Sequence, residues 1–294
     1  MPERIKFLIV SNARSGSTWL EMMLGELPDV ATDFEFKWRP RRYAPKPLHI
    51  VISDGGFSCA DAMDRIKGGT SAVGSKLVLD PRVHTAQEYR DLARTIEPGI
   101  RVIHLTRDYA DTLFSILRGT DNLLREGYRR SGSALFETLR EQTVPRAATA
   151  HRGRFPSFPR WMERLAAAAI PEGIKKGLRT RYRHRASVAE CRRFLDVMLA
   201  HDQWIAGLSS ERGHAMRIDY AAVPARFADV TAFVGSNATN AEREKILEDP
   251  PTQKLPRVAV DELVSDVGAV RALAAEYQER RDSPVGDAVK KGDG

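Results

Sequence analysis

The sequence predicts an α/β protein with a central, mostly parallel sheet that is flanked by helices. Short runs of β-branched and apolar residues alternate along the chain with helical patterns of apolar residues. Such alternation is typical of parallel sheets, because parallel strands need helical crossovers between them. The contents of hydrophobic residues (42%) and charged residues (29%) are those of a globular protein. They exclude a wholly disordered, a collagen-like or a multi-span membrane protein.

The elements follow in order from the N-terminus. Residues 5–10 form a short apolar run that stops at Ser11, and after a loop of small residues a helical pattern runs from Trp19 to Leu27. Pro98 and Gly99 break the chain before the predicted strand at 101–106. The further predicted strands are 48–52, 72–79, 101–106 and 215–220, and the further predicted helices are 60–67, 85–96, 109–117, 194–208, 224–234 and 260–277.

The length of 294 residues is enough for a sizeable core. We expect a single α/β domain over residues 1–281 and a frayed polar tail over 282–294. Residues 119–185 contain four prolines and no clear strand, which predicts a helical or irregular insertion. The insertion is basic, since residues 151–193 contain 12 Lys and Arg against three Glu, so the net charge of +7 resides in this part of the chain.

Only two cysteines, Cys59 and Cys191, are present, and no signal peptide or spanning segment is evident. These features predict a reducing, cytoplasmic compartment. The sequence has no His and Cys cluster with metal-ligand spacing, so we expect no metal.

The first motif is the segment SNARSGST (11–18), which lies between a predicted strand and a predicted helix. It has the eight-residue length of a P-loop, yet Ser11 replaces the first glycine and Ser17 replaces the usual lysine. The basic residue is instead Arg14. Free backbone N–H groups and the positive end of a helix hold anions at such a junction; a serine-rich turn that only caps a helix is the alternative.

The second motif, VIHLTRDYAD (102–111), continues to Ser115. Asp108 and Asp111 have the spacing of a capping box, which predicts that Arg107 leaves the tip of a strand and that Ser115 lies about two turns into the following helix. Both side chains would then reach one phosphate at the carboxyl edge of the sheet. A solvated helix start is the alternative for this motif alone.

Together the two motifs resemble those of sulfotransferases that use 3′-phosphoadenosine 5′-phosphosulfate (PAPS). RSGSTW (14–19) resembles the family's 5′-phosphosulfate loop, and Arg107 with Ser115 resembles its 3′-phosphate motif. RIDY (217–220), followed by FVG (233–235), is similar to a third family stretch. The resemblance covers about residues 5–235, with a weakly matched middle, and implies a P-loop NTPase-like sulfotransferase fold.

The resemblance implies a role for each matched residue. Arg14 matches the basic residue that contacts the leaving phosphosulfate, and the phosphate loop is matched by Ser15, Gly16, Ser17 and Thr18. Trp19 matches an aromatic residue that packs on adenine, although its spacing also suits a core residue. Arg107 and Ser115 match the ligands of the 3′-phosphate. Tyr220 matches a tyrosine near the adenine, but alanines replace the acidic pair that usually follows it.

The acceptor base is matched less closely. Phenol- and steroid-type members place a histidine two residues after a strand lysine, but here Lys76 is followed by Val78. Carbohydrate-type members carry a glutamate shortly after the first helix, where Glu35 lies in a segment that we expect to be an aromatic-flanked loop. Those surroundings favour a raised carboxyl pKa and a role as general base. His49 and His84 are alternative bases, and His104 lies within an apolar strand, as a core histidine would.

The resemblance thus predicts transfer of a sulfuryl group from PAPS to the hydroxyl of a small molecule, glycan or lipid-linked acceptor, with a carbohydrate or glycolipid preferred because of Glu35. The basic segment 151–193 would suit an anionic glycan or a peripheral membrane contact, and equally a solvated face. One alternative is a kinase or NTPase, which the missing glycine and lysine disfavour. The other is an RNA- or membrane-binding module; because no nucleic-acid motif is present, we expect no nucleic-acid partner.

Overall fold

The computed structural model describes residues 4–38, 50–52, 58–68, 70–81, 96–118, 185–250 and 260–283. The chain divides into two compact units: the first contains Met1–Arg107 and Ala200–Pro256, and the second contains Asp108–Leu199 and Arg257–Gly294. The single domain over 1–281 stays a prediction. The insertion over 119–185, apart from its last residue, and nearly all of the tail fall outside the described residues.

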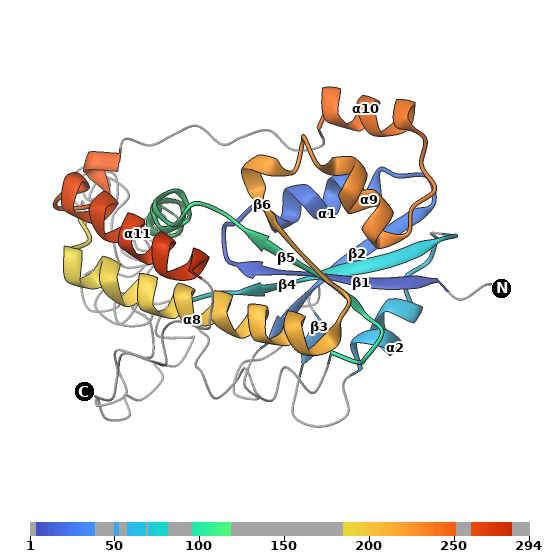
Figure 1. Ribbon diagram of the computed structural model, residues 1–294, viewed down its shortest axis with the longest axis horizontal. Helices are drawn as coiled ribbons and strands as arrows, with labels where there is room; N and C mark the ends of the chain where they lie inside the picture. The colour runs from blue at the N-terminus through green and yellow to red at the C-terminus, as the bar shows by residue number, and fades with distance from the viewer. Residues whose placement is uncertain are drawn as a thin grey trace, which may run out of the picture. The chain divides into compact units, whose positions relative to one another are not determined.

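The first unit is built on a six-stranded sheet (Figure 1). Its strands are β1 (Ile5–Asn12), β2 (Val30–Trp38), β3 (Ile50–Ile52), β4 (Ala72–Leu79), β5 (Arg101–Thr106) and β6 (Ala215–Asp219). They lie in the order β3-β2-β4-β1-β5-β6, and each neighbouring pair is parallel. The predicted α/β class with a parallel sheet is therefore confirmed.

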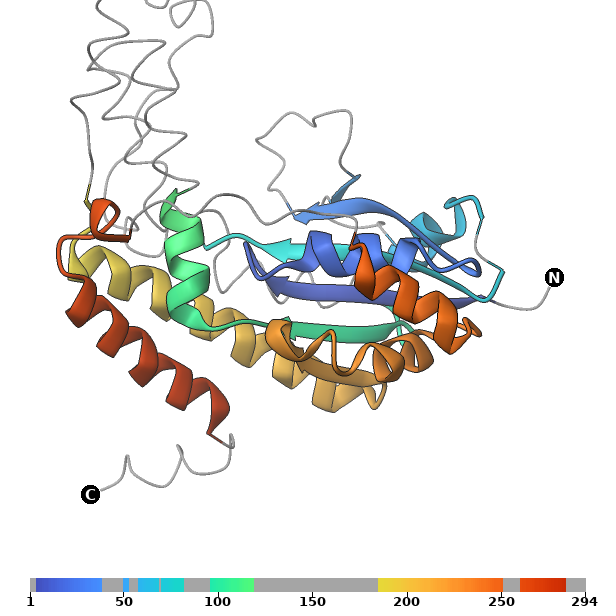
Figure 2. The ribbon, with the colours of Figure 1, turned by 90° about the horizontal axis from the view of Figure 1, so that it is seen from above.

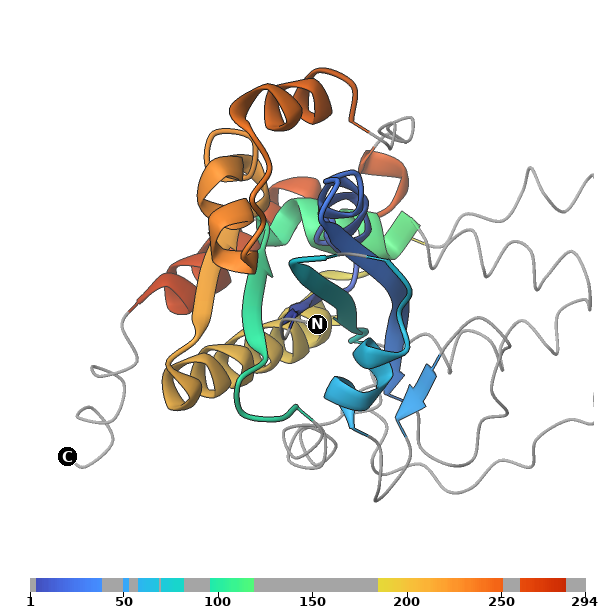
Figure 3. The ribbon, with the colours of Figure 1, turned by 90° about the vertical axis from the view of Figure 1, so that its right-hand side faces the viewer.

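Helices cover both faces of this sheet. Helices α1 (Ser17–Gly25) and α9 (Phe227–Val234) lie on one face. Helix α2 (Cys59–Asp64) and the part of α8 (Val188–Arg212) from Ala200 onward lie on the other (Figures 1 and 3). Figure 2 looks onto the face that carries α1. In β1, Phe7 and Ile9 belong to the core beneath α1 and α9, whereas Leu8 and Val10 belong to the core above α2 and α8. Burial on both faces explains why residues 5–10 show no polar alternation.

The boundaries of several elements agree with the sequence, and others need correction. The strands predicted at 72–79 and 101–106 are β4 and β5, whereas β1 continues for two residues beyond the prediction. The last helix, predicted from residue 260, is instead a short 3-10 turn, η3 (Val260–Glu262), followed by α11 (Val267–Asp282). Asp266 causes this break, because its side chain accepts from the Ala269 N–H and caps α11. The helix predicted at 85–96 lies outside the described residues, apart from Ile96.

Two elements were missing from the sequence prediction, and each had a signal. In β2 the aromatic residues Phe34, Phe36 and Trp38 alternate with charged residues, which is the period of a strand. Helix α10 (Asn240–Glu248) begins with a capping box, in which Thr239 and Glu242 exchange side-chain and backbone hydrogen bonds. The expectation of a loop around Glu35 is therefore wrong.

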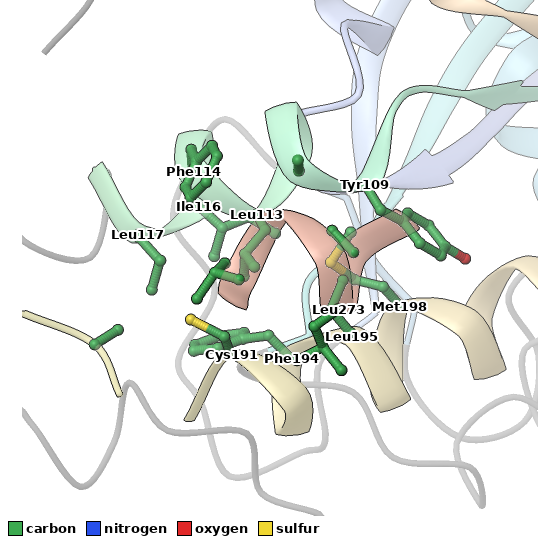
Figure 4. Close-up of a cluster of buried hydrophobic side chains, with 14 of the residues drawn as sticks. Tyr109, Leu113, Phe114, Ile116, Leu117, Cys191, Phe194, Leu195, Met198 and Leu273 are labelled. Carbon is green, nitrogen blue, oxygen red and sulfur yellow. The ribbon is translucent and has the colours of Figure 1, made fainter. Parts of the chain in front are cut away.

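The second unit packs a helix over residues 109–118 against the first part of α8 and against α11. Asp108 caps the 109–118 helix by accepting from the Asp111 N–H at 2.9 Å, as its spacing predicted. Figure 4 shows the apolar side chains that fill this core. Burial raises the pKa of the Cys191 thiol to about 12, so this cysteine is an inert core residue at neutral pH.

Asp29 links the amino-terminal edge of the sheet to the turn after α9 by hydrogen bonds. Its carboxylate accepts from the Ser236 hydroxyl and from the Asn237 N–H, both at 2.7 Å, so it ties the turn after α9 to the start of β2. Partial burial by itself would raise the pKa of the Asp29 carboxyl, but these hydrogen bonds outweigh it and lower that pKa below its ordinary value.

Replacing this carboxylate should cost stability in a pH-dependent way. A lowered folded-state pKa contributes stability above the unfolded pKa of about 4, and this contribution is lost as the pH falls through the folded value. We expect Asp29→Asn to lower the free energy of unfolding by about 1–2 kcal/mol at pH 7, with a smaller difference at pH 3. Urea unfolding of wild type and variant at both pH values measures this difference in the free energy of unfolding. The same difference at pH 7 and pH 3 would contradict a role for the charge.

Candidate functional site

The loop between β1 and α1 has a strained, closely fixed backbone. The Ser15 N–H donates to the Asn12 carbonyl at 3.3 Å, and the Ala13 N–H donates to the Leu79 carbonyl of β4 at 2.8 Å. Between them Arg14 has φ 70°, and among the described residues it is the only non-glycine residue with a positive φ. A Cβ atom is unfavourable in this left-handed conformation, so the surrounding contacts must hold this turn.

The loop is suited to an anion. Helix α1 begins at Ser17, its cap Gly16 has no side chain to satisfy the first N–H groups, and its first turn contains no acidic residue. The hydroxyl-bearing residues Ser15 and Ser17 are buried beside these groups, while Thr18 is exposed. Backbone donors and the positive helix end therefore converge where RSGSTW was predicted to bind phosphate.

The strand order places this loop at a topological switch point. After β1 the chain moves to β2 on one side of β1, and after β5 it moves to β6 on the other side. Ligands of open α/β sheets bind in the crevice outside the carboxyl ends of strands that diverge in this way. Arg14 follows β1 and Arg107 follows β5, so the sheet brings the two predicted basic residues to the same carboxyl edge.

Tyr220 joins these residues from β6. Asp219, the last residue of β6, accepts from the Ala221 N–H and so starts the short 3-10 helix η2 (Tyr220–Ala222). The Arg107 guanidinium carbon lies 5.0 Å from the centre of the Tyr220 ring, and Arg107 Nη1 donates to the Arg14 carbonyl at 3.2 Å. The Trp19 ring meets Tyr220 edge-on, with 5.0 Å between ring centres. Both aromatic side chains are half-buried.

Gly16 is required by this arrangement. It has φ 94°, and a Cβ there would lie 2.4 Å from Cδ2 of Tyr220. Any side chain at residue 16 would push Tyr220 away from Trp19 and Arg107. The tyrosine, the tryptophan and the loop are thus one packed group.

The other predicted site residues lie on other elements or outside the described residues. Ser115 is half-buried in the 109–118 helix of the second unit. Glu35 lies on β2, where its Cα pairs with that of Lys76. Lys76 in turn pairs with Ile9 of β1, three residues before the end of that strand. His49 and His84 lie outside the described residues.

Lys76, the strand lysine, is buried and forms an ion pair with Glu21 of α1. Its ammonium therefore faces the side of the sheet that carries the phosphate loop's own helix. Both side chains are at least nine-tenths buried, so removing either partner alone would leave the other charge in the core.

A buried polar network lies beneath the loop on the opposite face, and sequence reasoning found only one of its members. Asp202 of α8 accepts from Asn12 Nδ2 and from His104 Nε2, both at 3.0 Å, and His201 Nδ1 lies 2.6 Å from Asn12 Oδ1. All four side chains are buried. His104 is a hydrogen-bonded core histidine, as its apolar strand suggested. No signal in the sequence joins Asp202 to it.

In the described part of the chain, no three His, Cys, Asp or Glu side chains group as a metal site. No helix within the described ranges combines the length and the apolar character needed to span a membrane.

Comparison with known proteins gives a weak likeness to sulfotransferases. No protein-family model matches the chain, and no curated protein matches it. Among solved structures, a sulfotransferase from Alicyclobacillus acidocaldarius is 16% identical, with a TM-score of 0.37, over 84% of this chain and 90% of that one. Sulfotransferase STF9 from Mycobacterium avium is 13% identical, with a TM-score of 0.43, over 97% and 78%. Mouse sulfotransferase SULT7A1 complexed with PAP is 13% identical, with a TM-score of 0.36, over 91% and 74%.

Proposed function

We propose that this protein is a PAPS-dependent sulfotransferase that acts on an acceptor hydroxyl, with a carbohydrate or glycolipid as the preferred acceptor class. The observation that carries the proposal is the packed group of Arg14, Gly16, Trp19, Arg107 and Tyr220 at the switch point. It combines two arginine side chains that can bind phosphates, backbone N–H donors that can bind an anion, and two aromatic rings that can stack on a nucleotide base. These are the parts that an adenine nucleotide with two separate phosphate groups needs.

The residues fit a donor of this kind without a metal-binding acid. PAPS, as the donor, supplies the sulfuryl group, whose S–O bond to the 5′-phosphate breaks as the acceptor oxygen bonds to sulfur. Arg14 and the amides at the start of α1 stabilise the negative charge that grows on the leaving oxygen. Glu35 accepts the proton of the acceptor hydroxyl. Adenosine 3′,5′-bisphosphate is the product on the donor side.

The 3′-phosphate gives the proposal its test. Arg107→Ala and Ser115→Ala should each weaken the binding of adenosine 3′,5′-bisphosphate about 10- to 100-fold, because a charge-assisted hydrogen bond contributes about 1.5–3 kcal/mol. Binding of adenosine 5′-monophosphate should change far less. Titration calorimetry with both nucleotides, and with ATP plus Mg²⁺, measures this.

Two outcomes would count against the proposal. Equal losses for the two adenosine nucleotides would remove Arg107 and Ser115 from the 3′ subsite. A wild-type protein that binds ATP with Mg²⁺ and ignores the bisphosphate would favour the kinase or NTPase alternative. Lys6→Ala serves as the matched control, since Lys6 pairs with Asp64 away from this group.

A further inference from the structure

The polar network lies at one end of a mostly apolar interface between the sheet and α8. On the face of the sheet that α8 covers, β1 presents Leu8 and Val10, and then Asn12. On β5, apolar Val102 precedes His104. Helix α8 contributes apolar residues further along, Ile205 and Leu208, but His201 and Asp202 at this end. All three elements thus become polar toward the carboxyl ends of β1 and β5, next to the phosphate loop; His104 pairs in register with Val10, and Asn12 lies two residues further along β1.

The directions of the hydrogen bonds make this network specific. The Asp202 carboxylate can only accept, so Asn12 Nδ2 and His104 Nε2 donate to it. The amide of Asn12 is thereby oriented with Oδ1 toward His201, whose Nδ1 must donate. A carboxylate buried in this way costs free energy unless such donors surround it. An apolar residue would fill the same space without that cost, so stability alone does not account for the charge.

Asn12 connects the network to the loop. Its side chain is held by Asp202 and His201, its carbonyl accepts from the Ser15 N–H, and the next residue bonds to β4. The left-handed turn at Arg14 lies between these attachments. A strained backbone conformation persists only when surrounding contacts stabilise it. Here the network stabilises the turn at Arg14 through Asn12.

We propose that Asp202, supported by His104, is a positioning residue that fixes Asn12 and through it the conformation of the phosphate loop at residues 13–16. The expected effect of Asp202 on turnover rests on the proposed function. The expected effect of Asp202 on the conformation of the loop does not. Arg14 acts through its position when charge develops, so a small displacement of the loop should lower kcat more than it raises KM for the donor.

The test uses Asp202→Asn, which keeps the shape and removes the charge. We expect hydrogen exchange at the Ser15 and Gly16 amides to become at least about tenfold faster, and kcat with PAPS to fall about 10- to 100-fold. Ile205→Val is the matched control: it lies on the same helix in the apolar part of the interface, and it should leave loop exchange and kcat at wild-type values. Asn12→Ala, which spares the Asp202 and His104 pair, should act like Asp202→Asn.

An exchange of the two residues tests whether they act directly on each other. Asn12→Asp alone places two carboxylates together, whereas Asn12→Asp combined with Asp202→Asn restores one amide and one carboxylate. The double variant should lose less loop protection than the two single variants together. Additive losses would overturn direct positioning, as would an Asp202→Asn protein that is less stable but exchanges its loop amides like Ile205→Val. If the wild type transfers no sulfuryl group from PAPS, the proposed function fails, and the exchange measurements still decide the positioning role.

Discussion

Glu35→Gln is expected to abolish most sulfuryl transfer while leaving nucleotide binding intact. The amide keeps the shape of the side chain but cannot accept the acceptor's proton, so transfer should fall about 10²–10⁴-fold. The residual activity should also lose the acidic limb of its pH profile, because the group that must be ionised is gone. Steady-state kinetics with labelled PAPS and a set of saccharide acceptors, together with calorimetry on adenosine 3′,5′-bisphosphate, measures both parts.

The strand position of Glu35 makes a matched control available. Asp33 is acidic and lies on the same strand, two residues earlier, so Asp33→Asn removes a similar charge without the proposed base. Near wild-type transfer by Glu35→Gln, combined with loss of transfer in His49→Ala or His84→Ala, would make the base a histidine. The preference for a carbohydrate acceptor would then lose its main support.

Arg14→Ala should lower turnover by about 10²–10³-fold, as removal of a single oxyanion donor does. Negative charge on the bridging oxygen appears only as the S–O bond breaks, so affinity for adenosine 3′,5′-bisphosphate should fall much less. Single-turnover rates and calorimetry on the same variant separate the two effects. Wild-type turnover in Arg14→Ala would contradict the role.

The left-handed backbone at Arg14 predicts that two substitutions of this residue differ in stability. Arg14→Gly removes the same guanidinium but also relieves the strain at φ 70°, so we expect a gain of about 0.5–1 kcal/mol in the free energy of unfolding. Arg14→Ala keeps the strain and should gain nothing. Equal stability of the two variants, measured by urea unfolding, would show that this turn is unstrained.

Much of the sheet could be predicted from the sequence because its strands are buried on both faces and sharply bounded. Gly99 before β5 and the polar Ser71 before β4 mark their starts, and both strands were placed without error. Strand β2 was not predicted, because the aromatic and charged residues that alternate around Glu35 also fit an aromatic-flanked loop. The start of α11 was misplaced because Asp266 offered a better cap than any residue near 260.

The candidate site shows where prediction from sequence must stop. Arg14 and Arg107 were each placed after a predicted strand, and Tyr220 was placed at the end of one, which predicts a common edge of the sheet. Their mutual contacts depend on β1, β5 and β6 being neighbours, and nothing local in the sequence gives that order. The link between Asn12 and Asp202 spans 190 residues and joins a strand end to a helix. Such a contact follows from packing and register, which residue patterns do not encode.

The parallel sheet also has a consequence for how the chain folds. None of the described strand pairs is a hairpin, and β1 pairs with β4 and β5, which begin 67 and 96 residues after it starts. Bringing such distant segments together costs conformational entropy before the strand pairing can offset it. This entropy cost slows folding. During synthesis β1 can complete its pairing only after β4, and then β5, has been made. The phosphate loop, although it is made before β4 and β5, is therefore among the last parts of the first unit to reach its final conformation.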